Sequence, residues 1–137
     1  MLLKTIVLFT LSGFNVQQEK NSDSSIYDTK WVLKKIYVEN ELKEVNTTSI
    51  FIRFNKENNS AGGKGGCNSY GSSVTIEGDE IKFKSIFSTK MYCEQIQETE
   101  NLYLGLLGQA TNYALRDNEL QIFVNEKTFL VFEKEGE

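Results

Sequence analysis

Most of the chain after residue 25 alternates between apolar and polar residues over short segments, a pattern typical of β-strands. Residues 30–38 predict a first strand with Trp31 as a core anchor, and residues 50–54 predict a second with its apolar side chains on one face. Residues 74–83 alternate on both sides of Gly78, which indicates a β-hairpin. Three closing strands, joined by short polar links that favour antiparallel neighbours, are predicted at residues 113–115, 120–124 and 128–132.

The spacing of the apolar positions changes after Cys93. Between residues 94 and 110 they recur mostly at intervals of three and four, which predicts an amphipathic helix whose apolar face covers the sheet. These positions are Ile96, Leu102, Tyr103, Leu106, Leu107 and Ala110. The predicted fold class is therefore mainly β (α+β), a small antiparallel β-barrel-like sheet domain with one packed amphipathic helix.

Residues 62–71 contain five of the ten glycines and Cys67, one of the two cysteines. Glycines are expected at this density where the backbone takes positive φ or another group must come very close, so a bulged, sharply bent strand is predicted. A phosphate-binding P-loop needs Gly-Lys followed by Ser or Thr, whereas Lys64 is followed by Gly65. The pattern favours a structural corner over a nucleotide site.

The first 25 residues differ in character from the remainder. Residues 1–16 carry one lysine and then an apolar run as long as a signal-peptide core, which is shorter than the ~20 residues that span a bilayer. Residues 17–25 are almost wholly polar. We predict a signal peptide and a disordered polar tether in residues 1–25, no transmembrane span, and export to the periplasm or the medium without a lipoprotein cysteine. An ordinary amino-terminal strand of a cytoplasmic protein is the alternative.

Residues 26–137 have the size of one domain. With 12% aromatic residues, the composition suits a β-rich core and disfavours the disordered class. The net charge is −4 and lysines alternate with glutamates along the chain, which disfavours nucleic acid as a partner. We expect a monomer.

The chain has no histidine. This excludes Ser-His-Asp and Cys-His catalysis and zinc sites that use histidine, and two cysteines cannot complete an all-cysteine zinc site. The acidic residues are spread over turns and the helix without an obvious pair. We therefore predict no catalytic residue, no metal and no cofactor.

Cys67 and Cys93 are predicted to form a disulfide. Their number is even, the leader-like segment indicates an oxidising compartment, and both residues end strand-like segments beside loops that could bring them together. The bond would close a loop of about 26 residues and destabilise the unfolded state by ~3.5 kcal/mol. Two buried free thiols are the alternative.

An ordered set of short motifs resembles the META domain family, which includes the heat-shock lipoprotein HslJ. The resemblance covers roughly residues 27–133, and its motif positions in this sequence are Trp31, Gly66, Cys67, Asn68, Thr89, Met91, Cys93 and Glu100. It implies a small β-barrel-like sheet with one helix, found mostly in envelope and secreted bacterial proteins and associated with heat shock and resistance to some antibiotics. No biochemical activity is established for the family. Tyr92 replaces a small residue of the family pattern, so its side chain either faces outward or fills space that alanine leaves empty.

Three functions are compatible with these observations. We expect a non-enzymatic envelope or secreted module with an unknown protein partner and a binding or protective role under stress. The alternative is a carrier that holds a small apolar ligand inside the partly closed sheet. Its candidate aromatic residues are Phe51, Phe54, Phe83, Phe123, Phe129 and Phe132, for which ordinary core packing is the simpler explanation. An enzyme is the least favoured function.

Overall fold

The computed structural model describes residues 26–136, so the predicted signal peptide and tether lie outside the described residues. The described part contains nine strands and one helix. In chain order they are β1 (Trp31–Val38), β2 (Glu41–Lys43), β3 (Ile50–Asn55), β4 (Ser60–Gly65), β5 (Ser69–Glu77), β6 (Glu80–Ser88), α1 (Gln97–Leu107), β7 (Asn112–Arg116), β8 (Glu119–Phe123) and β9 (Phe129–Lys134).

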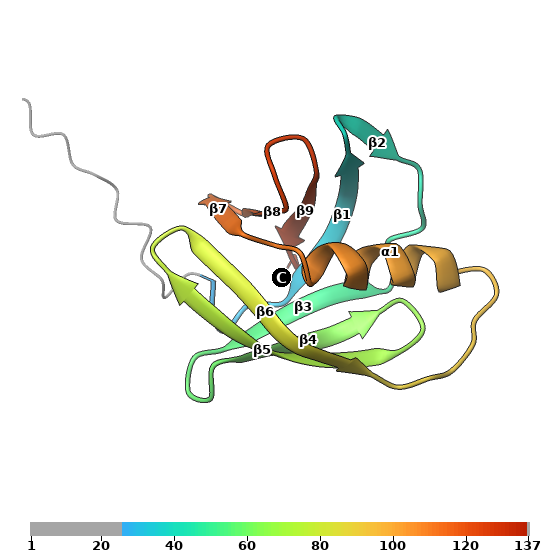
Figure 1. Ribbon diagram of the computed structural model, residues 1–137, viewed down its shortest axis with the longest axis horizontal. Helices are drawn as coiled ribbons and strands as arrows, with labels where there is room; N and C mark the ends of the chain where they lie inside the picture. Colours follow the sequence, from blue (N-terminus) through green and yellow to red (C-terminus); the bar gives the residue numbers. More distant parts are fainter. Residues whose placement is uncertain (1–25, 137) are drawn as a thin grey trace, which may run out of the picture.

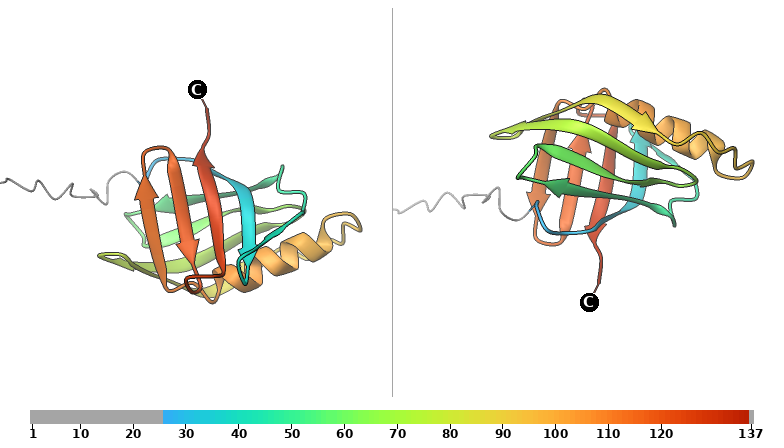
Figure 2. Two further views of the ribbon diagram at one scale, coloured as in Figure 1. Left: turned by 90° about the horizontal axis from the view of Figure 1, so that it is seen from above. Right: turned by 90° about the horizontal axis from the view of Figure 1, so that it is seen from below.

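The strands form one antiparallel sheet that closes in a ring. Its order is β2-β1-β3-β4-β5-β6-β7-β8-β9, and a further pairing of β1 with β9 joins the two ends. Two junctions are short, because β1 meets β3 at only two residue pairs and β6 meets β7 only at Glu80 and Asn112. The ring therefore has two layers that cross each other, β3 to β6 on one side and β7, β8, β9 and β1 on the other (Figure 2). The predicted antiparallel barrel-like sheet is confirmed.

The core lies between the two layers and is built from every second residue of the strands. Trp31 is 1% exposed, and its indole N–H donates a hydrogen bond to the carbonyl of Ile26 at 2.9 Å. The predicted anchor thus also fastens the segment before β1. Around it lie fully buried side chains from β1, β3, β6, α1, β8 and β9, which are Leu33, Ile36, Ile50, Ile52, Ile81, Leu107, Leu120, Ile122 and Phe132.

Helix α1 lies across the opening between the two layers (Figure 1). Its buried residues include Tyr103, Leu106 and Leu107, which belong to the predicted apolar face. The helix is shorter than the predicted span of residues 94–110. Residues 94–96 form a turn instead, in which the backbone N–H groups of Ile96 and Gln97 both donate to the carbonyl of Cys93.

The glycine-rich segment differs from the single bent strand that its sequence predicts. It forms β4, a tight turn at residues 66–68, and the start of β5. A Cβ on Gly62 would lie 2.6 Å from the carbonyl oxygen of Tyr70, so this glycine permits the close approach of neighbouring backbone. Strand β2 was also not expected, because it lies in a polar link without an apolar alternation.

Among the described residues, no helix combines the length and the apolar character needed to cross a bilayer.

Candidate functional site

Seven of the eight predicted motif residues meet at one corner of the domain. We call it the disulfide corner and define it as residues 65–68 between β4 and β5, residues 89–93 after β6, and Glu100 of α1. Trp31, the eighth motif residue, takes no part in the hydrogen bonds of this corner and instead contacts Ile26. The three segments are far apart in sequence, and the fold brings them together because β5 pairs with β6 and the helix follows β6 directly.

Cys67 and Cys93 are paired in a disulfide, with their Cα atoms 6.0 Å apart. Cys67 lies in the turn between β4 and β5, and Cys93 lies at the start of the turn that leads into α1. The bond therefore joins the glycine-rich turn to the beginning of the helix, in agreement with the prediction from sequence. Oxidation of these two cysteines in the native host stays a prediction.

Glu100 is 2% exposed, and its carboxylate accepts three hydrogen bonds from the glycine-rich turn. Oε2 accepts the backbone N–H groups of Cys67 and Asn68 at 2.9 and 2.7 Å, while Oε1 accepts the side-chain amide of Asn68 at 2.6 Å. Because a buried carboxylate must be compensated by donors, this turn and the first half of α1 require each other.

Asn68 is 3% exposed and uses all of its side-chain hydrogen-bonding capacity. Nδ2 donates to Glu100 and, at 3.0 Å, to the carbonyl oxygen of Met91. Oδ1 accepts the hydroxyl of Thr89 at 2.9 Å and the backbone N–H of Met91 at 2.8 Å. These contacts fix the orientation of the amide, since the reverse orientation would place oxygen against the carboxylate and two donors against each other.

The glycines of the turn are required by space and by backbone conformation. A Cβ on Gly65 would lie 3.1 Å from Cγ of Glu100. Gly66 has a φ of +123°, and a Cβ there would lie 2.5 Å from Cγ1 of Ile96. The predicted bend at this point therefore follows from the need to bring the turn against α1.

The disulfide corner leaves the side chains of Met91 and Tyr92 outside. Only the backbone of Met91 contacts Asn68, and its side chain is 60% exposed. Tyr92 is 77% exposed, which decides between the two alternatives for this position: its ring faces outward. The corner thus holds a short loop whose polar backbone faces inward and whose apolar side chains face solvent.

A pair of buried tyrosines lies beside the corner and was not identified from the sequence. The hydroxyl oxygens of Tyr70 and Tyr103 are 2.6 Å apart, and the Tyr70 hydroxyl donates to the carbonyl of Phe51 at 3.0 Å. Burial, followed by the neighbouring Tyr103, raises the pKa of Tyr70 well above its usual value. Burial also raises the pKa of Tyr103, although its hydrogen bond to Tyr70 acts in the opposite direction. The sequence placed Tyr103 only on the apolar face of the predicted helix. No local pattern links it to Tyr70, which is 33 positions away.

The chemistry available at the disulfide corner is structural. In residues 26–136 no buried side-chain nitrogen or oxygen lacks a hydrogen bond, and this includes those of Asn68 and Glu100 in the corner. Residues 26–136 also contain no group of three or more His, Cys, Asp or Glu side chains that could hold a metal ion. The carboxylate of Glu100 is 2% exposed and accepts three hydrogen bonds from the protein itself.

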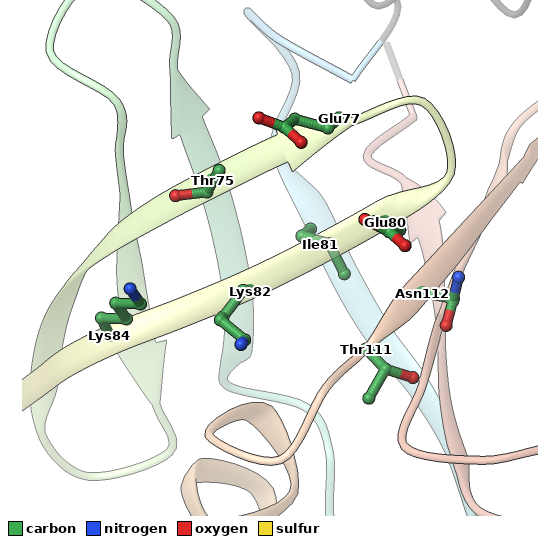
Figure 3. A pocket seen from close by; sticks show the side chains of 8 residues that line it. All are labelled: Thr75, Glu77, Glu80, Ile81, Lys82, Lys84, Thr111 and Asn112. Atoms are coloured by element: carbon green, nitrogen blue, oxygen red, sulfur yellow. The ribbon is translucent and has the colours of Figure 1, made fainter.

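A surface hollow of about 330 Å³ lies where β6 separates from β7 (Figure 3). Its lining residues are mostly polar or charged, and they are Thr75, Glu77, Glu80, Ile81, Lys82, Lys84, Thr111 and Asn112. The two glutamates lie near the β5–β6 turn and the two lysines lie further along β6. The lining is of mixed charge, unlike that of a site for a small apolar ligand.

The six aromatic residues of the carrier hypothesis divide into two groups. Phe54, Phe83 and Phe132 are buried in the core. The other three are half-buried: Phe129 stacks with Tyr37 and contacts Phe123, and Phe51 lies under the ammonium group of Lys30. Phe51 and Lys64 lie opposite each other on the outer face of the sheet. The aromatic residues therefore pack partly in the core and partly on the outer face of the sheet.

Comparisons with known proteins agree with this architecture. The model of the META domain family matches residues 24–137. A protein from Burkholderia xenovorans, solved by NMR, has 21% identity and a TM-score of 0.66, with 83% of this chain and 86% of that chain covered. The crystal structure of a DUF4847 family protein from Bacteroides vulgatus has 13% identity and a TM-score of 0.59, with 80% and 94% covered. A comparison with curated proteins gives no match. At these identities the solved structures show a shared fold.

Proposed function

Because this chain belongs to the META domain family, we propose that it is a non-enzymatic binding module that protects the cell envelope under stress such as heat or antibiotics. The observation that carries this proposal is that the disulfide corner bonds its buried polar groups inward and exposes apolar side chains to solvent. Its buried polar side chains, Asn68 and Glu100, bond within the corner, while Met91 and Tyr92 are held outward on a loop fastened at Asn68 and Cys93. Fixed, exposed apolar side chains are typical of a surface that contacts a partner.

Several features support a non-enzymatic role. The chain has no histidine to act as a base at neutral pH. Three buried ionisable groups, Glu100 and the paired Tyr70 and Tyr103, are hydrogen-bonded to partners in their own chain. Catalysis needs a group that is within reach of a substrate, and all three are buried.

An extracytoplasmic location is supported by the disulfide, since such bonds persist mainly in oxidising compartments. Fractionation of the native host, with amino-terminal sequencing of the purified protein, tests this part. We expect a mature start between Phe14 and Ile26 and recovery outside the cytoplasm. An intact Met1 in cytoplasmic protein would refute export.

The stress role is tested by deleting the gene and challenging the cells with heat and with envelope-active antibiotics. We expect reduced survival that is restored by the full chain but not by a version that begins at Ile26 and stays in the cytoplasm. Survival equal to that of the parent under every challenge would contradict the proposal. Native mass spectrometry of gently purified protein addresses the carrier alternative, because a retained apolar ligand would appear as added mass.

A further inference from the structure

The outer face of β3 to β6 carries a row that ends in an exposed aromatic ring. Arg53 lies opposite Gly62, and Gly62 lies opposite Gly71. Gly71 in turn lies opposite Phe87, so these four positions cross four strands on one face. A Cβ on Gly71 would lie 2.6 Å from Cζ of Phe87, so the ring lies against this glycine. Gly62 therefore leaves no side chain between Arg53 and the glycine that the ring contacts.

Three lysines flank this row on the same face. Lys64 lies opposite Ser69, Lys82 opposite Thr75 and Lys84 opposite Ser73, and all three lysines are exposed. Glu77 ends β5 and Glu80 begins β6, so the acidic residues of these two strands lie at one end of the face, in the hollow that they share with Lys82 and Lys84.

None of these lysines, nor Arg53, forms an ion pair, because the two ion pairs in the described part of the chain are Lys30–Glu135 and Lys43–Glu41. In a chain of net charge −4, the fold has gathered a locally cationic face from lysines that are interspersed with acids in the sequence.

The exposed apolar side chains gather at the end of this face. Of the four large hydrophobic residues that are exposed in the described structure, three lie within six positions: Phe87 (71%), Met91 (60%) and Tyr92 (77%). The segment that carries them continues alongside β5, where Thr89 donates its N–H to the carbonyl of Ser69, the residue opposite Lys64. The cations and the apolar side chains thus belong to adjoining parts of one surface.

We propose that this surface, defined by Arg53, Lys64, Lys82, Lys84, Phe87, Met91 and Tyr92, binds peripherally to a membrane rich in anionic lipids. This inference rests on the proposed binding role and names the partner. Cations close to an anionic leaflet each strengthen binding about fivefold. Aromatic and other apolar side chains are favourable at the headgroup boundary, where one end is apolar and the other is wet.

The rigidity of the disulfide corner favours this partner. Both the N–H and the carbonyl of Met91 are held by Asn68, and the next residue but one is held by the disulfide. The loop therefore loses little conformational entropy when it inserts.

Vesicle sedimentation of the oxidised chain tests the proposal. We expect binding to phosphatidylcholine vesicles that contain about one third phosphatidylglycerol, weak binding to pure phosphatidylcholine, and release in about 1 M salt, where the Debye length is about 3 Å. The triple variant Arg53→Gln/Lys64→Gln/Lys84→Gln should bind about 100-fold more weakly, as three cations at about fivefold each imply. The matched control Lys34→Gln/Lys35→Gln/Lys127→Gln removes the same charge from exposed positions outside β3 to β6 and should lose far less.

The apolar part is tested by fluorescence. A tryptophan placed by Tyr92→Trp should shift to shorter wavelength when anionic vesicles are added, whereas Leu42→Trp on β2 should not, and the native Trp31 is buried in both. Failure to bind anionic vesicles at low salt, equal loss in the two triple variants, or capture by an acidic protein or nucleic acid without vesicle binding would each overturn the inference. Such a failure leaves the survival assay of the proposed function unaffected, so the two can be told apart.

Discussion

Replacing Asn68 by Asp is the sharpest test of the disulfide corner, because the two side chains have nearly the same shape and differ in one donor group. In the native chain, Nδ2 of Asn68 donates to Oε1 of Glu100 at 2.6 Å and to the carbonyl of Met91 at 3.0 Å. An aspartate there would place a second carboxylate oxygen against the first. It would also leave the Met91 carbonyl without this donor.

The expected loss of stability is set by the less costly of two responses. If both carboxylates stay ionised, two unit charges about 4 Å apart repel by ~4 kcal/mol at an effective dielectric constant of about 20. If one instead takes up a proton at pH 7, about three pH units above its ordinary pKa, the cost is also ~4 kcal/mol. The two limits agree, and with the lost hydrogen bond to Met91 we expect ~4 to 5 kcal/mol at pH 7.

The loss should depend on pH in one direction. The folded variant holds a shared proton at pH values where both carboxyls of the unfolded chain have lost theirs, so its pair has a pKa above the unfolded value. Its stability relative to the native chain is therefore greatest below pH ~4 and falls as the pH rises above that value. At pH 4 we expect the difference to shrink to ~1 kcal/mol.

Urea unfolding followed by the fluorescence of Trp31 measures these quantities, since it is the only tryptophan and is buried. Asn118→Asp in the exposed β7–β8 turn makes the same chemical change and serves as the matched control. The companion variant Glu100→Gln should cost ~1.5 to 3 kcal/mol by itself, because an amide cannot accept all three hydrogen bonds. In the double variant, however, the new amide at position 100 can donate to the new carboxylate at position 68, so its loss should be clearly smaller than the sum of the two.

Additive losses, or an Asn68→Asp loss that is the same at pH 4 and pH 7, would refute this account of the corner. Either result would mean that the contacts between Asn68 and Glu100 do not govern its stability.

Three further predictions concern the core and the covalent link. Leu107→Ala, at a fully buried helix position, should lower the free energy of unfolding by ~2 to 5 kcal/mol, and a much smaller shift in a urea titration would show that α1 is peripheral. Since the pKa values of Tyr70 and Tyr103 are raised in the folded state, stability should fall as the pH rises above ~10, and phenolate absorbance should show at least two tyrosines that ionise only on unfolding. Alkylation of extracytoplasmic protein under denaturing, non-reducing conditions should label neither Cys67 nor Cys93, and two labelled thiols would exclude the disulfide.

The parts of the fold that follow from local patterns were predicted from the sequence. Alternation around Trp31 and the hairpin at Gly78 correspond to β1 and to the β5–β6 pair. Prediction failed where the local signal is missing. The glycines of β4 supply no side chains to alternate, and β2 is a three-residue strand of polar character.

The sequence predicted which residues belong to the site but not which of their atoms contact one another. The motifs identified Asn68, Met91 and Glu100, yet they could not indicate that the Met91 backbone rather than its side chain is the contact. Such a contact depends on the register of β5 with β6 and on the position of the helix, which are non-local. The Tyr70–Tyr103 pair and the cationic outer face were missed for the same reason.

The arrangement of the disulfide corner separates what stabilises it from what it presents. Gly66, Asn68 and Glu100 act through inward contacts, so changes there should alter stability first and surface properties only through unfolding. Position 92 has no inward contact to lose because its side chain is 77% exposed, and the family pattern places a small residue where this chain has tyrosine. A change at this position can therefore alter binding at little cost in stability, since exposed substitutions usually shift it by less than ~0.5 kcal/mol. The motif thus provides a rigid support, and we propose that the side chain at position 92 sets how strongly the chain binds at this corner.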